Sequence, residues 1–154
     1  MIQLDAIDRN ILAQLQADGR MTNAELAERV HLSQSACLRR VRRLEEGGVI
    51  DGYVMLVDPA AIGRPSTVFV EISLAGQSEE LLDAFEAAAR DCPGVMECYL
   101  MAGEADYLLR VVAADAQDYE RIHKTLRSRC PGVARIRSSF ALRTVCKTTA
   151  YDLE

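Results

Sequence analysis

The sequence is poor in several residue types, and these absences narrow the possible functions. Its 154 residues include no tryptophan, only two histidines and 5% aromatic residues. The apolar runs are only a few residues long, so no segment is expected to span a bilayer. The first residues lack the basic-then-apolar pattern of a secretion signal, and we expect a cytoplasmic protein. With 49% hydrophobic and 27% charged residues, the composition is typical of a globular chain of one large or two small domains.

The five cysteines show no pattern of a metal site or of a disulfide framework. Their number is odd, no two have C-x-x-C spacing, and two histidines are too few for a zinc cluster. We therefore expect buried, apolar cysteines in a reducing compartment, with no metal and no cofactor. No nucleophile, base and acid stand in a pattern typical of catalysis, so the sequence does not favour an enzyme.

The first domain, residues 1–60, has the pattern of three short helices. Apolar residues recur at helical spacing over residues 4–15. A capping-box pattern at residues 22–25 starts a second helix, and Ser33 caps a third helix over residues 34–46. Two short helices joined by a tight turn, with a supporting helix in front, predict a helix-turn-helix domain of the winged type.

A linker with turn-forming residues follows these helices. An Asp-Gly pair at residues 51–52 predicts a small hairpin over residues 49–54. Asp58-Pro59 and the Gly-Arg-Pro sequence at residues 63–65 interrupt regular structure, so we place the domain boundary near residue 60.

The second domain, residues 61–154, alternates strand, helix, strand, strand, helix, strand. The sequence CPGV occurs twice, at residues 92–95 and 130–133, and each copy leads from a helix into a strand. This order predicts a ferredoxin-like βαββαβ sandwich, so the fold class is α+β. The strands are apolar at nearly every residue, so the face without helices also needs a cover, and we expect at least a homodimer.

The third predicted helix carries an unusual concentration of arginine. At about 100° per residue, Ser35, Arg39 and Arg43 form the row opposite the apolar side, with Arg40 and Arg42 on the flanks. A helix in the major groove presents its central row to base edges and its flanks to phosphates. A solvated charged face is the alternative, but only Glu45 and Glu46 are close in sequence. The candidate DNA contacts are Thr22, Ser33, Gln34, Ser35, Arg39, Arg40, Arg42 and Arg43.

The net charge of -5 does not exclude DNA as a partner. Four of the seven arginines in residues 1–60 lie between Arg39 and Arg43, so the positive charge is local. Affinity for random DNA at physiological salt should therefore be poor.

The chain resembles the leucine-responsive/asparagine regulator (Lrp/AsnC) family over nearly its whole length. In the first domain the similarity lies in LDAIDRNIL at residues 4–12, TNAELA at 22–27 and RRVRRLEEGGVI at 39–50. In the second domain it lies in MAGEADYLL at residues 101–109, SSF at 138–140 and KTT at 147–149. All six segments occur in the family's order.

The resemblance implies a bacterial or archaeal regulator that binds promoter DNA as homodimers, which often assemble into tetramers or octamers. It also implies a small effector, usually an amino acid, that binds near the loop at residues 103–107 and changes the oligomeric state or the DNA binding of the protein. Glu104 or Asp106 would accept from the ammonium group of the amino acid. The effector-binding residues implied by the resemblance are Met101, Gly103, Glu104, Asp106, Tyr107, Ser138 and Ser139.

Two alternatives stand beside this interpretation. The loop at residues 103–107 can be a plain hairpin turn, in which glycine and aspartate serve only the backbone. The whole chain can be an effector-independent architectural DNA-binding protein, which would have the same arginines but no use for an effector loop.

Overall fold

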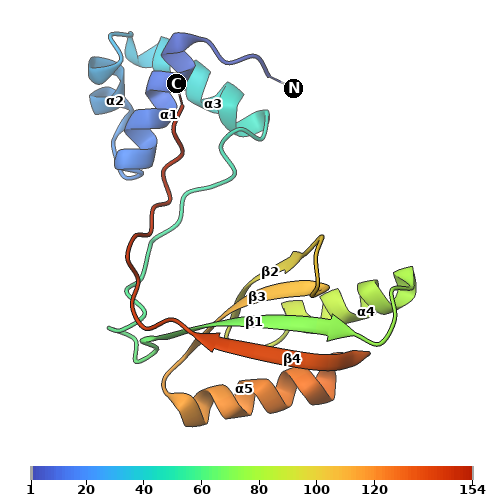
Figure 1. Ribbon diagram of the computed structural model, residues 1–154. Helices are drawn as coiled ribbons and strands as arrows, with labels where there is room; N and C mark the ends of the chain where they lie inside the picture. Colours follow the sequence, from blue (N-terminus) through green and yellow to red (C-terminus); the bar gives the residue numbers. More distant parts are fainter. Residues whose placement is uncertain (1, 154) are drawn as a thin grey trace. The chain divides into compact units, whose positions relative to one another are not determined.

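The computed structural model describes residues 2–153 and divides the chain into two compact units (Figure 1). The helical unit comprises the chain up to Leu56 together with a C-terminal tail that starts at Val145. The sheet unit comprises Val57–Thr144. The tail thus belongs to the helical unit, whereas the boundary predicted near residue 60 groups it with the second domain. No helix in the described chain is long and apolar enough to cross a membrane.

The helical unit contains the three predicted helices: α1 (Ala6–Ala17), α2 (Asn23–Arg29) and α3 (Gln34–Glu46). The predicted caps are confirmed. Thr22 and Glu25 form a capping box at α2, and the Ser33 hydroxyl accepts from the Ala36 N–H at α3. Asp5 and Asp8 form a further capping box at α1, which the sequence did not predict. The three helices enclose a core of Ile11, Leu12, Leu26, Ala27, Val30, Cys37 and Leu44.

The predicted hairpin at residues 49–54 is wrong, because residues 51–58 have no regular secondary structure. The N–H groups of Val49 and Ile50 both donate to the Leu44 carbonyl, at 2.9 and 3.1 Å, and close the end of α3. Gly48 adopts the positive φ of 68° that this kind of helix end requires. The N–H groups of Val49 and Ile50 are therefore not available for the strand pairing of a hairpin.

The tail contacts α1 through main-chain groups and through one apolar side chain. Gln16 donates from Nε2 to the Tyr151 carbonyl at 3.0 Å and accepts from the Tyr151 N–H at 2.7 Å. Arg9 donates to the Leu153 carbonyl at 2.9 Å, and the Leu153 side chain packs against the helical core. Tyr151 thus binds α1 through its backbone, whereas Leu153 contributes both its carbonyl and its side chain.

The sheet unit has the predicted order of elements: β1 (Ser66–Leu74), α4 (Glu79–Arg90), β2 (Val95–Leu100), β3 (Tyr107–Ala113), α5 (Ala116–Arg129) and β4 (Val133–Phe140). The four strands pair antiparallel in the order β2-β3-β1-β4, and both helices cover the same face (Figure 1). This is the ferredoxin-like sandwich that the sequence predicted.

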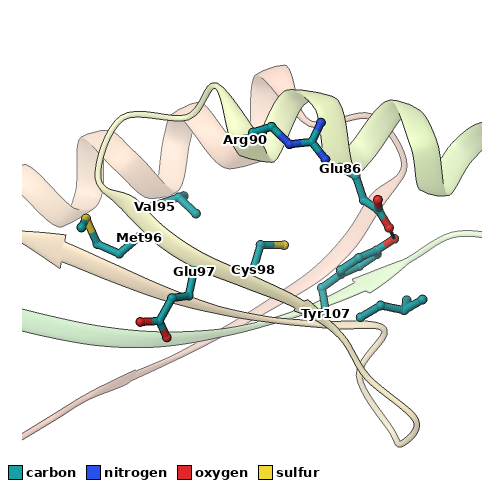
Figure 2. Close-up of a pocket in the computed structure, with 8 residues that line it drawn as sticks. Glu86, Arg90, Val95, Met96, Glu97, Cys98 and Tyr107 are labelled. Atoms are coloured by element: carbon teal, nitrogen blue, oxygen red, sulfur yellow. Dashed lines mark hydrogen bonds between the residues drawn. The ribbon is translucent and has the colours of Figure 1, made fainter. Parts of the chain in front are cut away.

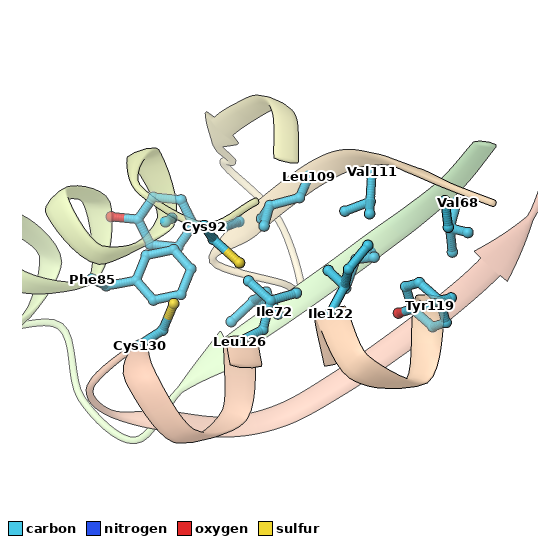
Figure 3. Close-up of a cluster of buried hydrophobic side chains, with 14 residues drawn as sticks. Val68, Ile72, Phe85, Cys92, Leu109, Val111, Tyr119, Ile122, Leu126 and Cys130 are labelled. Carbon is cyan, nitrogen blue, oxygen red and sulfur yellow. The ribbon is translucent and has the colours of Figure 1, made fainter. Parts of the chain in front are cut away.

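The core of the sheet unit lies between this face and the two helices (Figure 3). Phe85 of α4 contacts Tyr107 of β3 with ring centroids 4.5 Å apart, and Leu126 of α5 is fully buried. The glycine of each CPGV copy has a positive φ, 88° at Gly94 and 72° at Gly132. Each copy therefore turns the chain from a helix into the next strand.

The face of the sheet without helices, here called the open face, is less apolar than the sequence predicted. On β1, Val68, Val70 and Ile72 are fully buried under the helices, whereas Phe69 is 42% exposed on the open face. Glu71 lies on the open face as well and pairs across the strands with Arg137. Because side chains alternate between the two faces of a strand, the apolar residues gather under the helices and the open face carries charged as well as apolar side chains.

Candidate nucleic-acid interface and effector pocket

Helix α3 has the geometry of a DNA-reading helix. Cys37 and Leu44 are completely buried against α1 and α2, which fixes the side of α3 that faces inward. The turn before α3 is held by Asn23, whose Nδ2 donates to the Gln34 carbonyl at 2.9 Å, and by a positive φ of 55° at His31. The opposite side of the helix is exposed along its whole length.

Two of the four arginines are free on this exposed side. Arg39 and Arg42 make no ion pair and no side-chain hydrogen bond within residues 2–153. Ser35 is also exposed and shares a 3.3 Å hydrogen bond only with Ser33. The sequence predicted Arg43 in the central row and Arg42 on a flank. In the structure Arg42 lies on the exposed side of α3 without an ion pair, whereas Arg43 pairs with Asp8 of α1.

The other two arginines turn toward α1. Arg40 Nη1 lies 2.7 Å from Asp5 Oδ2 and 2.8 Å from Asp8 Oδ1, and Arg43 Nη2 pairs with Asp8 Oδ2. The backbone N–H of Asp8 and the Arg40 guanidinium lower the pKa of Asp5 to about 2. Glu45 and Glu46 are the only acids close to these arginines in sequence. Asp8 could not be predicted as a partner, because Arg40 and Arg43 lie 32 and 35 positions from it in the chain.

The polar residues at the helix starts are occupied as caps. The Thr22 hydroxyl donates to the Glu25 carboxylate at 2.7 Å, and the Ser33 hydroxyl accepts from the Ala36 N–H at 3.3 Å. Both side chains are therefore occupied within the fold. At these positions the backbone N–H groups of the helix start can contact a phosphate. Gln34 is exposed at the beginning of α3.

The open face of the sheet holds a cavity of about 200 Å³ next to the loop predicted to bind an effector. Residues of β1, β3 and β4 and of the loop between β2 and β3 line it: Glu71, Met101, Gly103, Glu104, Ala105, Leu108, Arg135 and Arg137. Three of the seven predicted effector residues, Met101, Gly103 and Glu104, are among them. We call this cavity the loop pocket.

Opposite charges meet in pairs around the loop pocket. Arg135 Nη2 lies 2.8 Å from Glu104 Oε1, and Arg137 Nη1 lies 3.4 Å from Glu71 Oε2. The hydrogen bond and charge of Arg135 lower the pKa of Glu104. Neither arginine is among the effector residues predicted from the sequence, although their spacing of two along a predicted strand places them on one face.

Asp106 lies in the same loop but serves a different purpose. Its carboxylate accepts from the Leu74 N–H at 2.7 Å and from Gln77 Nε2 at 2.8 Å. These two hydrogen bonds, the first above all, lower the pKa of Asp106. Asp106 therefore ties the loop to the end of β1 and is already occupied by protein donors.

The remaining predicted effector residues lie away from the loop pocket. Tyr107 is buried under α4 and donates to Glu86 at 2.9 Å, and burial raises the pKa of its phenol. Ser138 faces the helices and hydrogen-bonds with the Tyr119 hydroxyl. Ser139 pairs with Phe69 of β1. The loop reaches β1 three positions further along, where the Asp106 N–H donates to the Ile72 carbonyl. Neighbouring residues of a strand point to opposite faces, so Ser138 and Ser139 do not share a site within one chain.

A second cavity, of about 420 Å³, lies between α4 and the edge strand β2. Figure 2 shows Cys98 of β2 pointing toward Arg90 of α4, with Glu86 beside Tyr107. The expectation of buried cysteines is wrong for Cys98, which is exposed, but partial desolvation by the cavity walls raises the pKa of its thiol and disfavours a reactive thiolate. No group of histidine, cysteine, aspartate or glutamate side chains in residues 2–153 is arranged to hold a metal ion.

Comparison with known proteins gives consistent matches to both units. A model of the Lrp/AsnC ligand-binding domain matches residues 67–151, and a model of winged helix-turn-helix DNA-binding domains matches residues 4–51. The chain is 53% identical over 116 residues to an HTH-type transcriptional regulator of Sinorhizobium fredii, covering 75% of this chain and 91% of the relative. It is 43% identical over 153 residues to the Bkd operon transcriptional regulator of Pseudomonas aeruginosa, covering 99% of this chain and all of the relative.

Solved structures agree with these matches. The crystal structure of a transcriptional regulator of Neisseria meningitidis in complex with L-methionine superposes with a TM-score of 0.92. That protein is 37% identical, and the alignment covers 98% of this chain and 97% of the other.

Proposed function

The chain belongs to the Lrp/AsnC family of transcriptional regulators, and from this premise we propose that it binds promoter DNA through α3 and an amino acid at the loop pocket. The bound amino acid changes the affinity of the chain for DNA. The two matching domains, one for DNA and one for a ligand, carry the general function. The loop pocket carries the specific part of the proposal, because it places opposite charges beside apolar side chains.

The proposed ligand chemistry follows from these groups. A free amino acid presents a carboxylate and an ammonium group a few ångströms apart. The guanidinium of Arg137 or Arg135 fits the carboxylate, and Glu71 or Glu104 fits the ammonium group. Each arginine already pairs with a carboxylate, so a zwitterion can replace these pairs without leaving a charge uncompensated. L-Methionine, which the similar Neisseria regulator binds, is the first ligand to test.

The DNA contacts proposed here are narrower than the sequence predicted. The exposed side of α3 presents Arg39 and Arg42 without intramolecular partners, and these two are our candidates for base and phosphate contacts. Ser35 lies on the same exposed side. Arg40 and Arg43 serve first to hold α3 against α1.

We also propose that the open face is an interface between two copies of the chain. Phe69 and Tyr99 are about half exposed there, beside charged pairs that a second copy can meet with pairs of its own. A ligand in the loop pocket would then lie close to that interface. Sedimentation of the wild type should show at least a dimer, and Phe69→Lys should shift it toward the monomer.

Isothermal titration with L-amino acids tests the proposed pocket. Arg137→Gln should weaken binding at least ten-fold, since it removes a charge-assisted contact. Arg127→Gln, an exposed arginine near the end of α5, is the matched control and should leave the affinity unchanged. Equal affinities in the wild type and Arg137→Gln would place the ligand elsewhere.

A further inference from the structure

The exposed surface of α3 offers fewer free cations than its sequence contains. Four arginines lie between residues 39 and 43, but Arg40 and Arg43 are engaged by acids of α1. Asp8 is the centre of this contact. It is fully buried, yet its carboxylate bonds to both guanidinium groups and accepts from the Asp5 N–H at 3.1 Å.

Because Asp8 is buried, Arg40 and Arg43 cannot both dissociate from it at low cost. A buried carboxylate without cationic partners is strongly unfavourable, so at least one arginine must stay with it. Arg40 has a second acid, Asp5, and is only 27% exposed. Arg43 is 48% exposed and bonds to Asp8 alone, so its guanidinium is close to solvent but occupied.

We propose that Asp8 is a specificity-determining residue for DNA binding: it withholds Arg40 and Arg43 from the phosphate backbone. This inference rests on the proposed function and adds to it a limit on non-specific affinity. Phosphate contacts attract a protein to every sequence equally, whereas base contacts discriminate. Because Asp8 occupies Arg40 and Arg43, Arg39 and Arg42 remain to contact DNA. With fewer phosphate contacts, the part of the affinity that is independent of DNA sequence is smaller.

The proposal gives a measurable salt dependence. Each phosphate contact to duplex DNA contributes about 0.9 to the slope of log affinity against log salt. Asp8→Asn keeps the shape of the side chain but removes the charge that holds both arginines. It should steepen the slope on an unrelated duplex by about 1–2. The ratio of specific to non-specific affinity should fall.

The experiment measures fluorescence anisotropy of labelled duplexes over a series of salt concentrations. Glu46→Gln is the matched control, since it removes one negative charge from α3 without releasing an arginine, and its slope should equal that of the wild type. In the native background, Arg42→Gln should reduce the slope by about 0.9, whereas Arg43→Gln should leave it unchanged. The comparison of these two arginine variants stands even if Asp8→Asn fails to fold.

The possible outcomes separate the two proposals. Equal losses of slope in Arg42→Gln and Arg43→Gln would show that Arg43 reaches phosphates. This result would overturn the role of Asp8 but not the proposed function. A steeper slope in Glu46→Gln that matches Asp8→Asn would also overturn it, since net charge would then suffice. A wild-type chain that binds no duplex would refute the proposed function, and the inference with it.

Discussion

Replacement of Asp106 by alanine should destabilise the sheet unit rather than remove a ligand contact. The sequence pattern made Asp106 a candidate partner for the ammonium group of an amino acid. In the structure its carboxylate accepts from the Leu74 N–H at 2.7 Å and from Gln77 Nε2 at 2.8 Å. The substitution would remove both acceptors and leave the Leu74 N–H without its partner.

The expected loss of stability follows from these two bonds. A hydrogen bond to a charged group contributes about 1.5–3 kcal/mol, and partial exposure of Asp106 reduces this contribution. We expect a loss of about 2 kcal/mol for both bonds together. In a unit of this size, that loss lowers Tm by about 8–16 °C.

The same residue should affect the pH dependence of stability. The pKa of folded Asp106 lies below its ordinary value of 3.8, first because of the Leu74 N–H and then because of Gln77. Stability from such a group is present above the unfolded pKa and is lost as the pH falls through the folded pKa. Asp106→Asn should therefore flatten the decline of wild-type stability below about pH 4.

Differential scanning calorimetry and ligand titration together decide the point. Glu104→Ala is the control, because Glu104 is an exposed acid of the same loop whose ion pair contributes little to stability. It should keep the wild-type Tm and weaken ligand binding. The reasoning is refuted if Asp106→Ala keeps the wild-type Tm and abolishes ligand binding.

Three further predictions concern the fold around the two sites. Gln16→Ala should free the tail, and hydrogen exchange at the Tyr151 amide should rise well above that of the wild type, whereas unchanged exchange would argue against the contact. Gly94→Ala should cost about 1–3 kcal/mol in urea unfolding. The reason is that its φ is 88° and a Cβ would lie 3.0 Å from the Val112 carbonyl oxygen. Leu126→Ala, at a fully buried position, should cost about 2–5 kcal/mol in the same assay, and a loss below 1 kcal/mol would contradict its place in the core.

Local signals were enough to predict most of the secondary structure. Caps such as Thr22 and Ser33 act within three residues, and the structure confirms both. The CPGV repeat marked the two helix-to-strand turns, and the strand order followed from the alternation of elements. The hairpin prediction failed because helix-end hydrogen bonds to Leu44 compete with strand pairing, and a short motif does not reveal that competition.

The candidate sites depend on contacts between distant residues, and these were harder to predict. Nothing near α3 in sequence shows that Asp8 will hold Arg40 and Arg43, because the contact requires α1 to pack beside α3. The pairing of β1 with β4 brings Arg137 to Glu71, 66 positions away. Family resemblance pointed to the loop at residues 103–107, beside which the cavity lies, but it did not separate Glu104, which lines the loop pocket, from Tyr107 and Ser138, which face the helices.

The central claim is that an amino acid changes the affinity of this chain for DNA. It is tested most directly by the Kd for a duplex selected by the protein from genomic fragments, measured by anisotropy with and without saturating L-amino acids. A coupling of about 1–3 kcal/mol, which is usual between two allosteric sites, changes Kd about 5–150-fold for at least one amino acid. A duplex that binds tightly with the same Kd in the presence of every amino acid would contradict the account and favour an architectural DNA-binding protein.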